Sequence, residues 1–424
     1  MDDIIIIGAG PSGLMAAIQA SYLGASVTVL ERNDKPLKKL YATGNGRCNF
    51  SNTYMDDKVY RGRDPKFAYR VIDDFDRNDL LLFFHNMGMM TKHIGGYIYP
   101  YNEQARTVAD TLLLECRRLA IPIKCNEYVV DIKYDDAFGA KTENNEYKGR
   151  KLILAYGGMA SPAHGSDGSL NKVIRGLGID CVKQERALVP LLFSDKGLSK
   201  LAGVRVKCSV TLYVDDEPVS GERGEIIFNK DNISGIPVMQ VSRYATGALE
   251  QGRSVSVGID LFPDEDPDEL NRLIYNTFKG YRYSGGAMEG NARKADIRYD
   301  RRSEEALSLI INEKLALYCL NALGIVPGAL SVNTEDKKLK RLAGLLKDLR
   351  ILIKGDAGWE RAQVTAGGVL TGGLSEELES LKIPGLYAVG ELCDIDGTCG
   401  GYNLQWAFSS GAVAGRSAAS RINR

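Results

Sequence analysis

The pattern of hydrophobic and polar positions predicts an α/β protein with an all-β segment in its middle. Four consecutive isoleucines at 4–7 are typical of a strand buried on both faces, as in a parallel sheet. Short apolar runs at 27–30, 151–154 and 386–389 predict three further strands. The strands at 4–7, 27–30 and 386–389 lie near the two ends of the chain, and we expect the two ends to contribute to one site.

The middle of the chain follows a different pattern. Apolar and polar residues alternate over 204–214 and again over 255–261, which is typical of half-buried strands. A further short strand is expected at 225–228. Together these segments predict a small antiparallel barrel.

Apolar residues at helical spacing predict the helices. Ser303 and Thr334 are expected to be N-caps, because acidic residues follow each of them in the first turn. The expected helices cover residues 12–23, 267–278, 303–323, 334–349 and 402–419.

A glycine motif connects the first strand to the first helix. Gly8 allows a tight turn, Gly10 lets the backbone approach a pyrophosphate, and Gly13 lets the helix pack close to the strand. The helix begins at about Ser12, and its first amides can bind phosphate oxygens. Glu31 follows the second strand, where a carboxylate binds ribose hydroxyls and repels a 2′-phosphate. This site suits FAD or NAD rather than NADP.

A polar, glycine-rich segment follows at 38–52. It can wrap the pyrophosphate and ribityl chain of an extended FAD, although a surface loop rich in turn formers is the alternative. Arg47 supplies a fixed positive fork. Cys48 could be redox-active only with a partner from far along the chain, such as Cys399. The short polar and glycine residues of this segment are Thr43, Gly44, Asn45, Gly46, Asn49 and Ser51.

A second glycine-rich segment lies near the carboxyl end. The strand at 386–389 leads to Gly390 and Glu391, and a glycine pair at 400–401 precedes a helix. A helix start aimed at the pyrimidine edge of a flavin stabilises negative charge on the reduced ring. Glu391 is placed to hold ribityl hydroxyls. An ordinary strand-turn-helix unit is the alternative.

Residues 44–49, 364–369 and 390–406 together resemble one family of bacterial flavoproteins, the NAD(P)/FAD-dependent oxidoreductases that include aminoacetone oxidases and a bile-acid 3-oxo-Δ4 reductase. The resemblance covers almost the whole chain. It implies non-covalent FAD in a discontinuous Rossmann-like domain. We expect this domain to comprise residues 1–187 and 360–424. The insert at 188–359 is expected to hold the barrel and a helical subdomain on the substrate side.

The resemblance also implies the residues that contact FAD, including a backbone contact to adenine from Val130. With Gly8 from the glycine motif, the predicted set is Gly8, Gly10, Ser12, Gly13, Glu31, Arg32, Thr43, Gly46, Arg47, Cys48, Asn49, Val130, Gly390, Glu391, Gly401, Tyr402, Asn403 and Leu404.

Two segments depart from the family pattern, at 96–100 and 229–237, and both are expected to face the substrate. The substrate therefore stays open at this point. Tyr99, Tyr101 and Tyr402 lie in or near motif segments and are candidate catalytic acids or hydrogen-bond donors. The alternative for each is a packed aromatic residue with a hydrogen-bonded hydroxyl.

Composition excludes several other functions. Lys plus Arg and Asp plus Glu each number 54, so the chain lacks the positive field of a dedicated nucleic-acid binder, and membrane binding is not expected either. The acidic start and the lack of a long apolar run predict a cytoplasmic protein. Eight scattered cysteines and three separated histidines predict no metal site. A basic run at 293–302 is interpreted as solvated surface, with a site for a carboxylate or an NADPH phosphate as the alternative.

Three functions fit these patterns. The first is an FAD-dependent reductase of a small or steroid-like keto or enone substrate. Its donor would be NAD(P)H, bound transiently because no second dinucleotide fingerprint is visible. The second is an oxidase of a small amine such as aminoacetone. The third is a flavin-dependent RNA-modifying protein or a flavin-binding regulator. The sequence leaves open the donor, the catalytic acid or base, the oligomeric state and whether Cys48 is redox-active.

Overall fold

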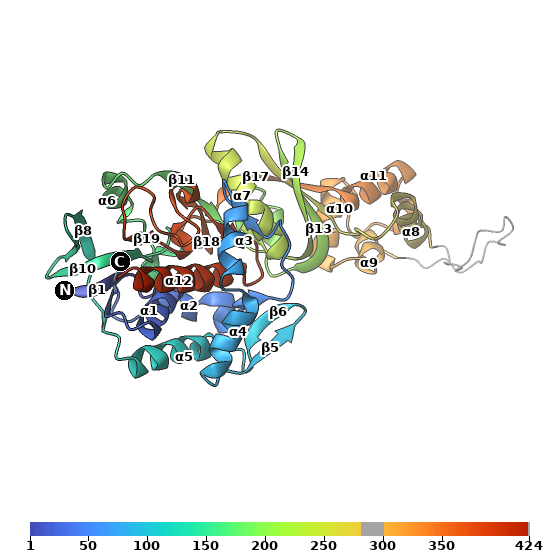
Figure 1. The fold of residues 1–424 in the computed structure, drawn as a ribbon. Coiled ribbons are helices and arrows are strands. Elements are labelled where there is room, and N and C mark those ends of the chain that lie inside the picture. Colours follow the sequence, from blue (N-terminus) through green and yellow to red (C-terminus); the bar gives the residue numbers. More distant parts are fainter. Residues whose placement is uncertain (281–300, 423–424) are drawn as a thin grey trace. The chain divides into compact units, whose positions relative to one another are not determined.

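The structure is a computed structural model that describes residues 1–280 and 301–422. Arg293, Lys294 and Arg298 of the basic run lie outside the described residues. By its internal contacts the chain divides into two compact units. The first comprises Met1–Leu188 and Gly358–Arg424, and the second comprises Val189–Ala357 (Figure 1).

The first unit is built on a seven-stranded sheet in the order β7-β2-β1-β10-β9-β8, with β19 paired to β10. The strands β7, β2, β1, β10 and β19 run parallel, whereas β9 and β8 are antiparallel additions. The isoleucines of β1 are buried, as the apolar run predicts. The bounds are β1 Asp2–Ile7, β2 Val27–Leu30, β7 Ile123–Lys124, β8 Val129–Tyr134, β9 Phe138–Thr142, β10 Glu146–Leu154 and β19 Leu386–Ala388.

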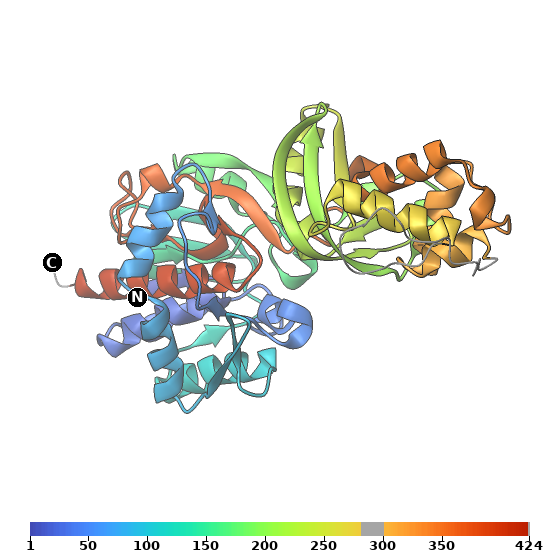
Figure 2. The same ribbon diagram turned by 90° about the vertical axis from the view of Figure 1, so that its right-hand side faces the viewer.

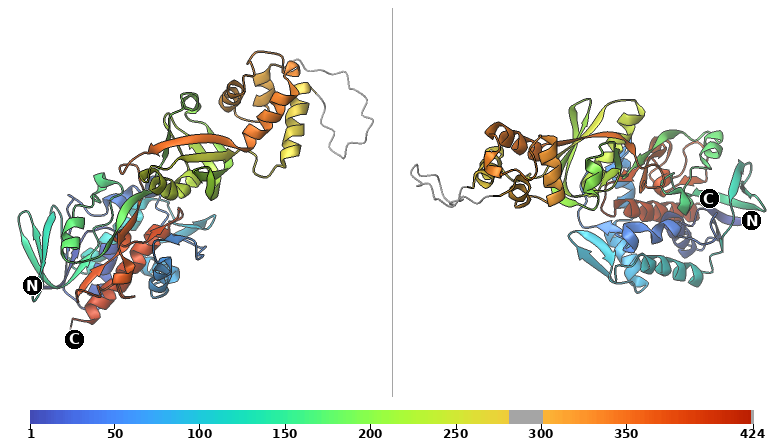
Figure 3. Two further views of the ribbon diagram at one scale, coloured as in Figure 1. Left: turned by 90° about the horizontal axis from the view of Figure 1, so that it is seen from above. Right: turned by 180° about the vertical axis from the view of Figure 1, so that it is seen from behind.

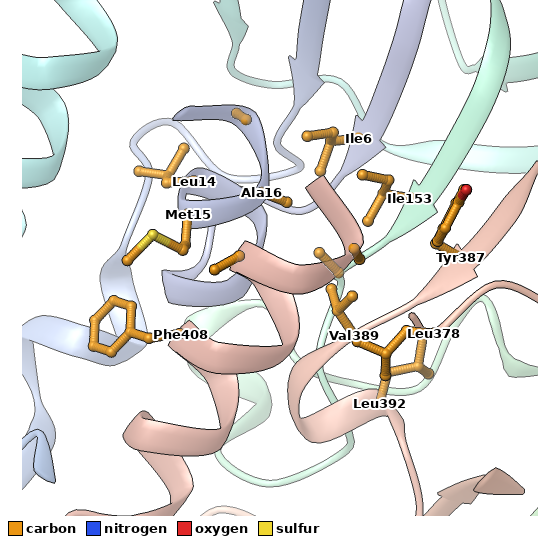
Figure 4. Packing of buried hydrophobic residues seen from close by; sticks show 14 of the residues in the cluster. Ile6, Leu14, Met15, Ala16, Ile153, Leu378, Tyr387, Val389, Leu392 and Phe408 are labelled. Carbon is orange, nitrogen blue, oxygen red and sulfur yellow. The ribbon is translucent and has the colours of Figure 1, made fainter. Parts of the chain in front are cut away.

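Two helices from opposite ends of the chain, α1 (Pro11–Tyr22) and α12 (Tyr402–Ser420), pack against each other in this unit. A Cβ added at Gly411 would lie 2.3 Å from the Ser12 carbonyl oxygen, and one at Gly415 would lie 2.3 Å from that of Ala16. Only glycine permits such an approach. Figure 4 shows Leu14, Met15 and Ala16 of α1 in one core with Phe408 of α12. Ile6 and Ile153 of the sheet belong to the same core.

Smaller elements complete the first unit. A three-stranded sheet has the order β3-β6-β5, β11 pairs with β18, and β20 pairs with β4. The remaining strands are β3 Ser51–Asn52, β4 Tyr60–Arg61, β5 Thr91–Ile94, β6 Tyr97–Pro100, β11 Cys181–Ala187, β18 Val364–Val369 and β20 Asp396–Gly397. The remaining helices are α2 Lys38–Tyr41, α3 Pro65–Asp73, α4 Arg77–Asn86, α5 Ala105–Arg118 and α6 Asn171–Gly176.

The second unit contains a closed six-stranded antiparallel barrel in the order β12-β15-β14-β13-β16-β17 (Figure 2). Alternate residues of β13, including Cys208, Val210 and Leu212, are buried, so the alternating pattern predicted this barrel correctly. Its strands are β12 Leu191–Phe193, β13 Arg205–Val214, β14 Glu217–Phe228, β15 Asn232–Ser234, β16 Val255–Asp260 and β17 Leu349–Asp356. The strand predicted at 225–228 is the end of the longer β14.

Helix α7 packs against β14, and four more helices gather at one end of the barrel (Figure 3). The apolar side of α11 is core, as predicted, because Leu339, Leu342 and Leu346 are buried. The bounds are α7 Ile236–Glu250, α8 Pro267–Lys279, α9 Ser303–Ser308, α10 Glu313–Ala322 and α11 Asp336–Lys347.

Four details of the helix predictions in this unit were wrong. The helix predicted at 303–323 is two helices, because Asn312 caps α10 by accepting a hydrogen bond from the Lys314 amide at 3.0 Å. Ser303 is not an N-cap, since its hydroxyl donates to the Ala329 carbonyl instead. Thr334 is not an N-cap either, because Glu335 takes that position. The last predicted residue, Leu349, begins β17.

Within residues 1–280 and 301–422, no helix is long and apolar enough to cross a membrane.

Candidate cofactor site

The turn after β1 is shaped by glycine. Gly8 has φ of 106°, and a Cβ there would lie 2.5 Å from the Ala155 carbonyl oxygen of the neighbouring strand end. A Cβ at Gly13 would lie 2.0 Å from the Gly8 carbonyl oxygen. At Gly10 the Cβ position has nothing within 4 Å. Gly8 and Gly13 are therefore required by packing, whereas Gly10 borders free space where a ligand can approach the backbone.

The start of α1 is open to an anion. Gly10 precedes the helix with no side-chain cap, and Pro11 is its first residue. The first amides of a helix have no intrahelical acceptor, and the helix dipole places partial positive charge there. This end of α1, beside the space at Gly10, therefore has the features of a phosphate site.

Glu31 is fixed against the glycine turn. Its side chain is buried, and its Oε2 accepts a hydrogen bond from the Ala9 amide at 2.9 Å. Its Oε1 accepts from the Asn33 amide at 2.8 Å and from Asn33 Nδ2 at 2.7 Å. A carboxylate has about four acceptor positions, so the structure holds this group rigidly and leaves capacity for a further donor.

Arg32 follows Glu31 in the sequence, and Val130 lies in β8. The Arg32 guanidinium pairs with Asp167 at 2.6 Å and lies 4.6 Å from the centre of the Tyr128 ring. The register between β8 and β9 shifts between Val129 and Asp131, so Val130 falls outside the paired positions. A bulged residue keeps its backbone groups free of the ladder, which suits the predicted backbone contact.

The segment predicted to wrap the cofactor contacts the start of α12. Thr43 Oγ1 donates to the Leu40 carbonyl at 2.6 Å. Asn49 Oδ1 accepts from the Ile98 amide at 3.2 Å and would lie 2.7 Å from a Cβ at Gly401. The structure thus brings Asn49 of this segment against Gly401 at the start of α12.

Arg47 and Cys48 are more constrained than their sequence suggests. Arg47 pairs with Glu103, and its guanidinium lies 4.9 Å from the centre of the Tyr99 ring. Cys48 is fully buried, and burial raises the pKa of its thiol to about 12. Within residues 1–280 and 301–422, none of the eight cysteines forms a disulfide. Because a thiolate is the reactive form, the dithiol alternative loses its nucleophile.

Gly390 lies between α1 and α12. Its amide donates to Ser410 Oγ at 3.0 Å, and its carbonyl accepts from Trp406 Nε1 at 2.9 Å. A Cβ at this position would lie 2.6 Å from Ser12 Oγ. The turn that carries Glu391 is therefore locked to both α1 and α12.

The start of α12 is also uncapped. Gly401 has φ of 92° and offers no side-chain cap. Asn403 closes the preceding turn, because its side chain and the Gly397 backbone exchange two hydrogen bonds of 2.8 Å. Leu404 is partly buried and packs against the core.

The three candidate tyrosines differ in their surroundings. The buried Tyr402 donates to the Tyr54 carbonyl at 2.9 Å, and burial raises its pKa to about 12. This arrangement matches the packed-aromatic alternative. Tyr101 is 60% exposed, with the Lys92 ammonium 5.6 Å from its ring centre. Tyr99 is half-buried under Arg47.

The starts of α1 and α12 are staggered. Gly411 of α12 contacts Ser12, and Gly415 contacts Ala16, so the helices run in the same direction. Tyr402 begins α12 nine residues before Gly411, which at 1.5 Å per residue is an overhang of about 14 Å. Two positive helix ends, separated along one axis, suit a long ligand with a diphosphate at one point and an electron-accepting ring further on. The residues fit extended FAD.

Sequence reasoning missed two residues between these helix starts. Lys39 Nζ lies 2.5 Å from Glu391 Oε2. Thr365 donates to Glu391 Oε1 through its amide at 3.0 Å and its hydroxyl at 2.9 Å. Lys39 is adjacent to Lys38 and of the same type, so no sequence signal separates the two, whereas Thr365 lies in a segment that only the family resemblance singled out.

The fold and the site define the class of protein, a flavoprotein with a Rossmann-like FAD-binding domain. The sequence model of the HI0933-like protein Rossmann domain matches residues 2–417, and the chain belongs to this family. The predicted family resemblance and fold class are confirmed.

Two relatives match over nearly their full length. A 3-dehydro-bile acid delta(4,6)-reductase of Clostridium scindens is 35% identical over 99% of this chain and 100% of its own. A ribosomal RNA dihydrouridine synthase of Escherichia coli is 28% identical over 96% of each chain. Among solved structures, a 3-ketosteroid delta1-dehydrogenase from Sterolibacterium denitrificans covers 99% of each chain with 13% identity and a TM-score of 0.48. The chain is an FAD-dependent oxidoreductase.

Proposed function

We propose that the protein reduces a carbon–carbon double bond conjugated to a carbonyl group, in a small or steroid-like enone, with NAD(P)H as the electron donor. The observation that carries this proposal is the match of the whole chain, at 35% identity, to a reductase of a 3-dehydro-bile acid. In a 3-oxo-Δ4 steroid the double bond is conjugated to the carbonyl, so its far carbon accepts a hydride.

The cofactor would be held along α1 and α12. Amides at the start of α1 would bind the diphosphate next to Gly10, and Glu31 would accept hydrogen bonds from ribose hydroxyls. The amides after Gly401 would face the ring edge that becomes anionic. Bound FAD would supply hydride transfer. The full proposed set is Gly8, Gly10, Ser12, Gly13, Glu31, Arg32, Thr43, Gly46, Arg47, Cys48, Asn49, Val130, Gly390, Glu391, Gly401, Tyr402, Asn403 and Leu404.

Reduction of an enone also needs a proton at the carbon next to the carbonyl. Tyr99 is our candidate among the three tyrosines, because it is half-buried and lies in β6 of the sheet β3-β6-β5. Strand β3 of this sheet is linked to α12 by a hydrogen bond from Ser51 Oγ to Gln405 Oε1. The hydroxyl of Tyr402 is already used by Tyr54, and Tyr101 is largely exposed. A half-buried phenol can donate a hydrogen bond or a proton to a substrate oxygen.

One observation favours a second candidate, an RNA-modifying reductase. The Escherichia coli relative forms dihydrouridine, and the double bond reduced in uracil is also conjugated to a carbonyl. The same chemistry would therefore serve both substrates. The zero net charge of the chain weighs against RNA, because phosphate contacts require an excess of Lys and Arg.

Anaerobic spectroscopy separates these functions. The purified, FAD-loaded protein is mixed with NADH or NADPH, and a 3-oxo-Δ4 steroid is then added. We expect the nicotinamide to bleach the visible flavin band and the steroid to restore it with consumption of the enone. Bleaching by aminoacetone but not by NAD(P)H would identify an oxidase instead. Restoration by ribosomal RNA but not by any enone would identify the RNA-modifying function.

A further inference from the structure

A half-buried ion pair links the two ends of the chain inside the first unit. Lys39, in α2, and Glu391, just after β19, are separated by 352 positions in sequence and by 2.5 Å between Nζ and Oε2. Their side chains are 25% and 21% exposed. Dissolved salt screens a partly buried ion pair much less than an ion pair on the surface.

Glu391 is held from its other side as well. Its Oε1 accepts two hydrogen bonds from Thr365, whose side chain is fully buried. Thr365 Oγ1 also accepts from the Met159 amide at 2.8 Å and the Ala160 amide at 3.0 Å. Lys39 and Thr365 therefore hold the carboxylate directly, and the 159–160 backbone holds Thr365 in turn. Among the described residues that these hydrogen bonds join, the formal positive charge comes from Lys39.

The pair lies between the two helix starts. Glu391 follows Gly390, which contacts Ser12 at the start of α1 and is bonded to Trp406 and Ser410 of α12. Lys39 precedes the turn at 43–49, which reaches Gly401 through Asn49. An unpaired carboxylate at this place would repel a diphosphate and an anionic reduced ring.

We propose that Lys39 is a positioning residue that neutralises Glu391, so that this carboxylate can accept hydrogen bonds from the FAD ribityl chain without repelling the diphosphate. The proposal rests on the proposed function, in that it requires FAD to lie along α1 and α12. An ammonium has three donors and Glu391 uses one of them, so Lys39 can also donate to the cofactor.

The neighbouring Lys38 provides a matched control. It has the same side chain in the same helix, but it pairs with Asp34, whose side chain is 67% exposed. Ion pairs on the surface contribute little to stability. FAD affinity is measured by titrating the FAD-free protein and following flavin fluorescence. We expect Lys39→Met to weaken binding by about tenfold or more, and Lys38→Met to change it by less than about twofold. Equal affinities of the two variants would overturn the proposal.

A double variant tests the charge argument itself. Lys39→Met combined with Glu391→Gln removes both charges, so it is expected to bind FAD more tightly than Lys39→Met alone. Lys39→Arg keeps the charge and is expected to stay within about threefold of the wild type. If the double variant binds no better than Lys39→Met, charge neutralisation is wrong. Should Lys39→Met not fold, the other two variants carry the test, and failure of both to bind FAD would overturn the proposal.

Measurements on the wild-type protein separate a failure of the proposed function from a failure of the proposed role of Lys39. If it takes up no FAD, the proposed function fails. If it takes up FAD and reduces an enone while all Lys39 variants bind FAD as it does, only the role of Lys39 fails.

Discussion

The α1–α12 contact of the first unit and the barrel core of the second unit are packed in different ways. In the first unit, glycines at 13, 390, 411 and 415 let backbones approach so closely that a Cβ would lie 2.0 to 2.6 Å from a neighbouring atom. In the second unit, the core is made of alternating aliphatic residues such as Val210, Leu212 and Val257. The barrel is filled by large side chains, whereas the α1–α12 contact requires residues without a side chain. The difference teaches that close backbone approach determines the α1–α12 contact, whereas burial of aliphatic side chains determines the barrel.

The largest expected effect falls on the barrel. Leu212 is fully buried in the core of the second unit, so Leu212→Ala should lower the free energy of unfolding by about 2–5 kcal/mol. We expect the folded variant to bind FAD as the wild type does, because Leu212 belongs to the other unit. Urea denaturation and FAD titration check both parts. A large loss of FAD affinity in the folded variant would break the comparison.

Two glycines of the first unit sharpen the comparison. Gly13→Ala should destabilise the FAD-free protein by about 2–3 kcal/mol, because its Cβ would overlap the Gly8 carbonyl. Gly10→Ala should leave the FAD-free protein as stable or more stable, since its φ of −80° suits alanine and its Cβ meets free space. The same methyl group should weaken FAD binding by about tenfold or more, about 1.4 kcal/mol. Tight FAD binding by Gly10→Ala would contradict the proposed diphosphate position.

Variants of Tyr99 and Tyr402 distinguish a tyrosine that donates a proton from one that only stabilises the fold. Tyr99→Phe should slow enone reduction by about tenfold or more while reduction by NAD(P)H stays unchanged, because only proton donation is removed. Tyr402→Phe should lose one hydrogen bond to Tyr54, about 1 kcal/mol of stability, with little change in rate. Stopped-flow kinetics of both half-reactions measure these effects. The opposite pattern would assign the proton to Tyr402.

The smallest effect concerns pH. The Cys48 pKa is raised from 9.0 to about 12 by burial, so the neutral thiol stabilises the fold at pH values below 9. That contribution is lost as the pH rises from 9 towards 12, because the unfolded chain ionises first. Between pH 8 and 9.5 the wild type should lose on the order of 1 kcal/mol more stability than Cys48→Ala. Equal losses would show that Cys48 is not protected from ionisation.

Much of the fold was predictable because its signals are local. Four isoleucines, the glycine motif and the alternation over 204–214 each predict one element from its own residues. The break between α9 and α10 was missed, because the apolar periodicity continues through it and only the capping of Asn312 ends it.

The site was predictable in part for the same reason. Glu31 and Gly401 lie next to recognisable motifs. In the structure Glu31 is bonded to the turn before α1, and Gly401 immediately precedes α12. Lys39 and Thr365 belong to the site because they contact Glu391 from distant segments of the chain. No local pattern indicated that Arg47 pairs with Glu103. Contacts across hundreds of positions leave no local pattern to read.

The central claim is that the staggered starts of α1 and α12 hold one FAD. Equilibrium titration of the FAD-free protein with FAD, followed by fluorescence and by the visible spectrum, tests it most directly. We expect uptake of one FAD per chain, with affinity reduced by Gly10→Ala although that variant remains folded. A correctly folded wild-type protein that takes up no FAD would contradict the account.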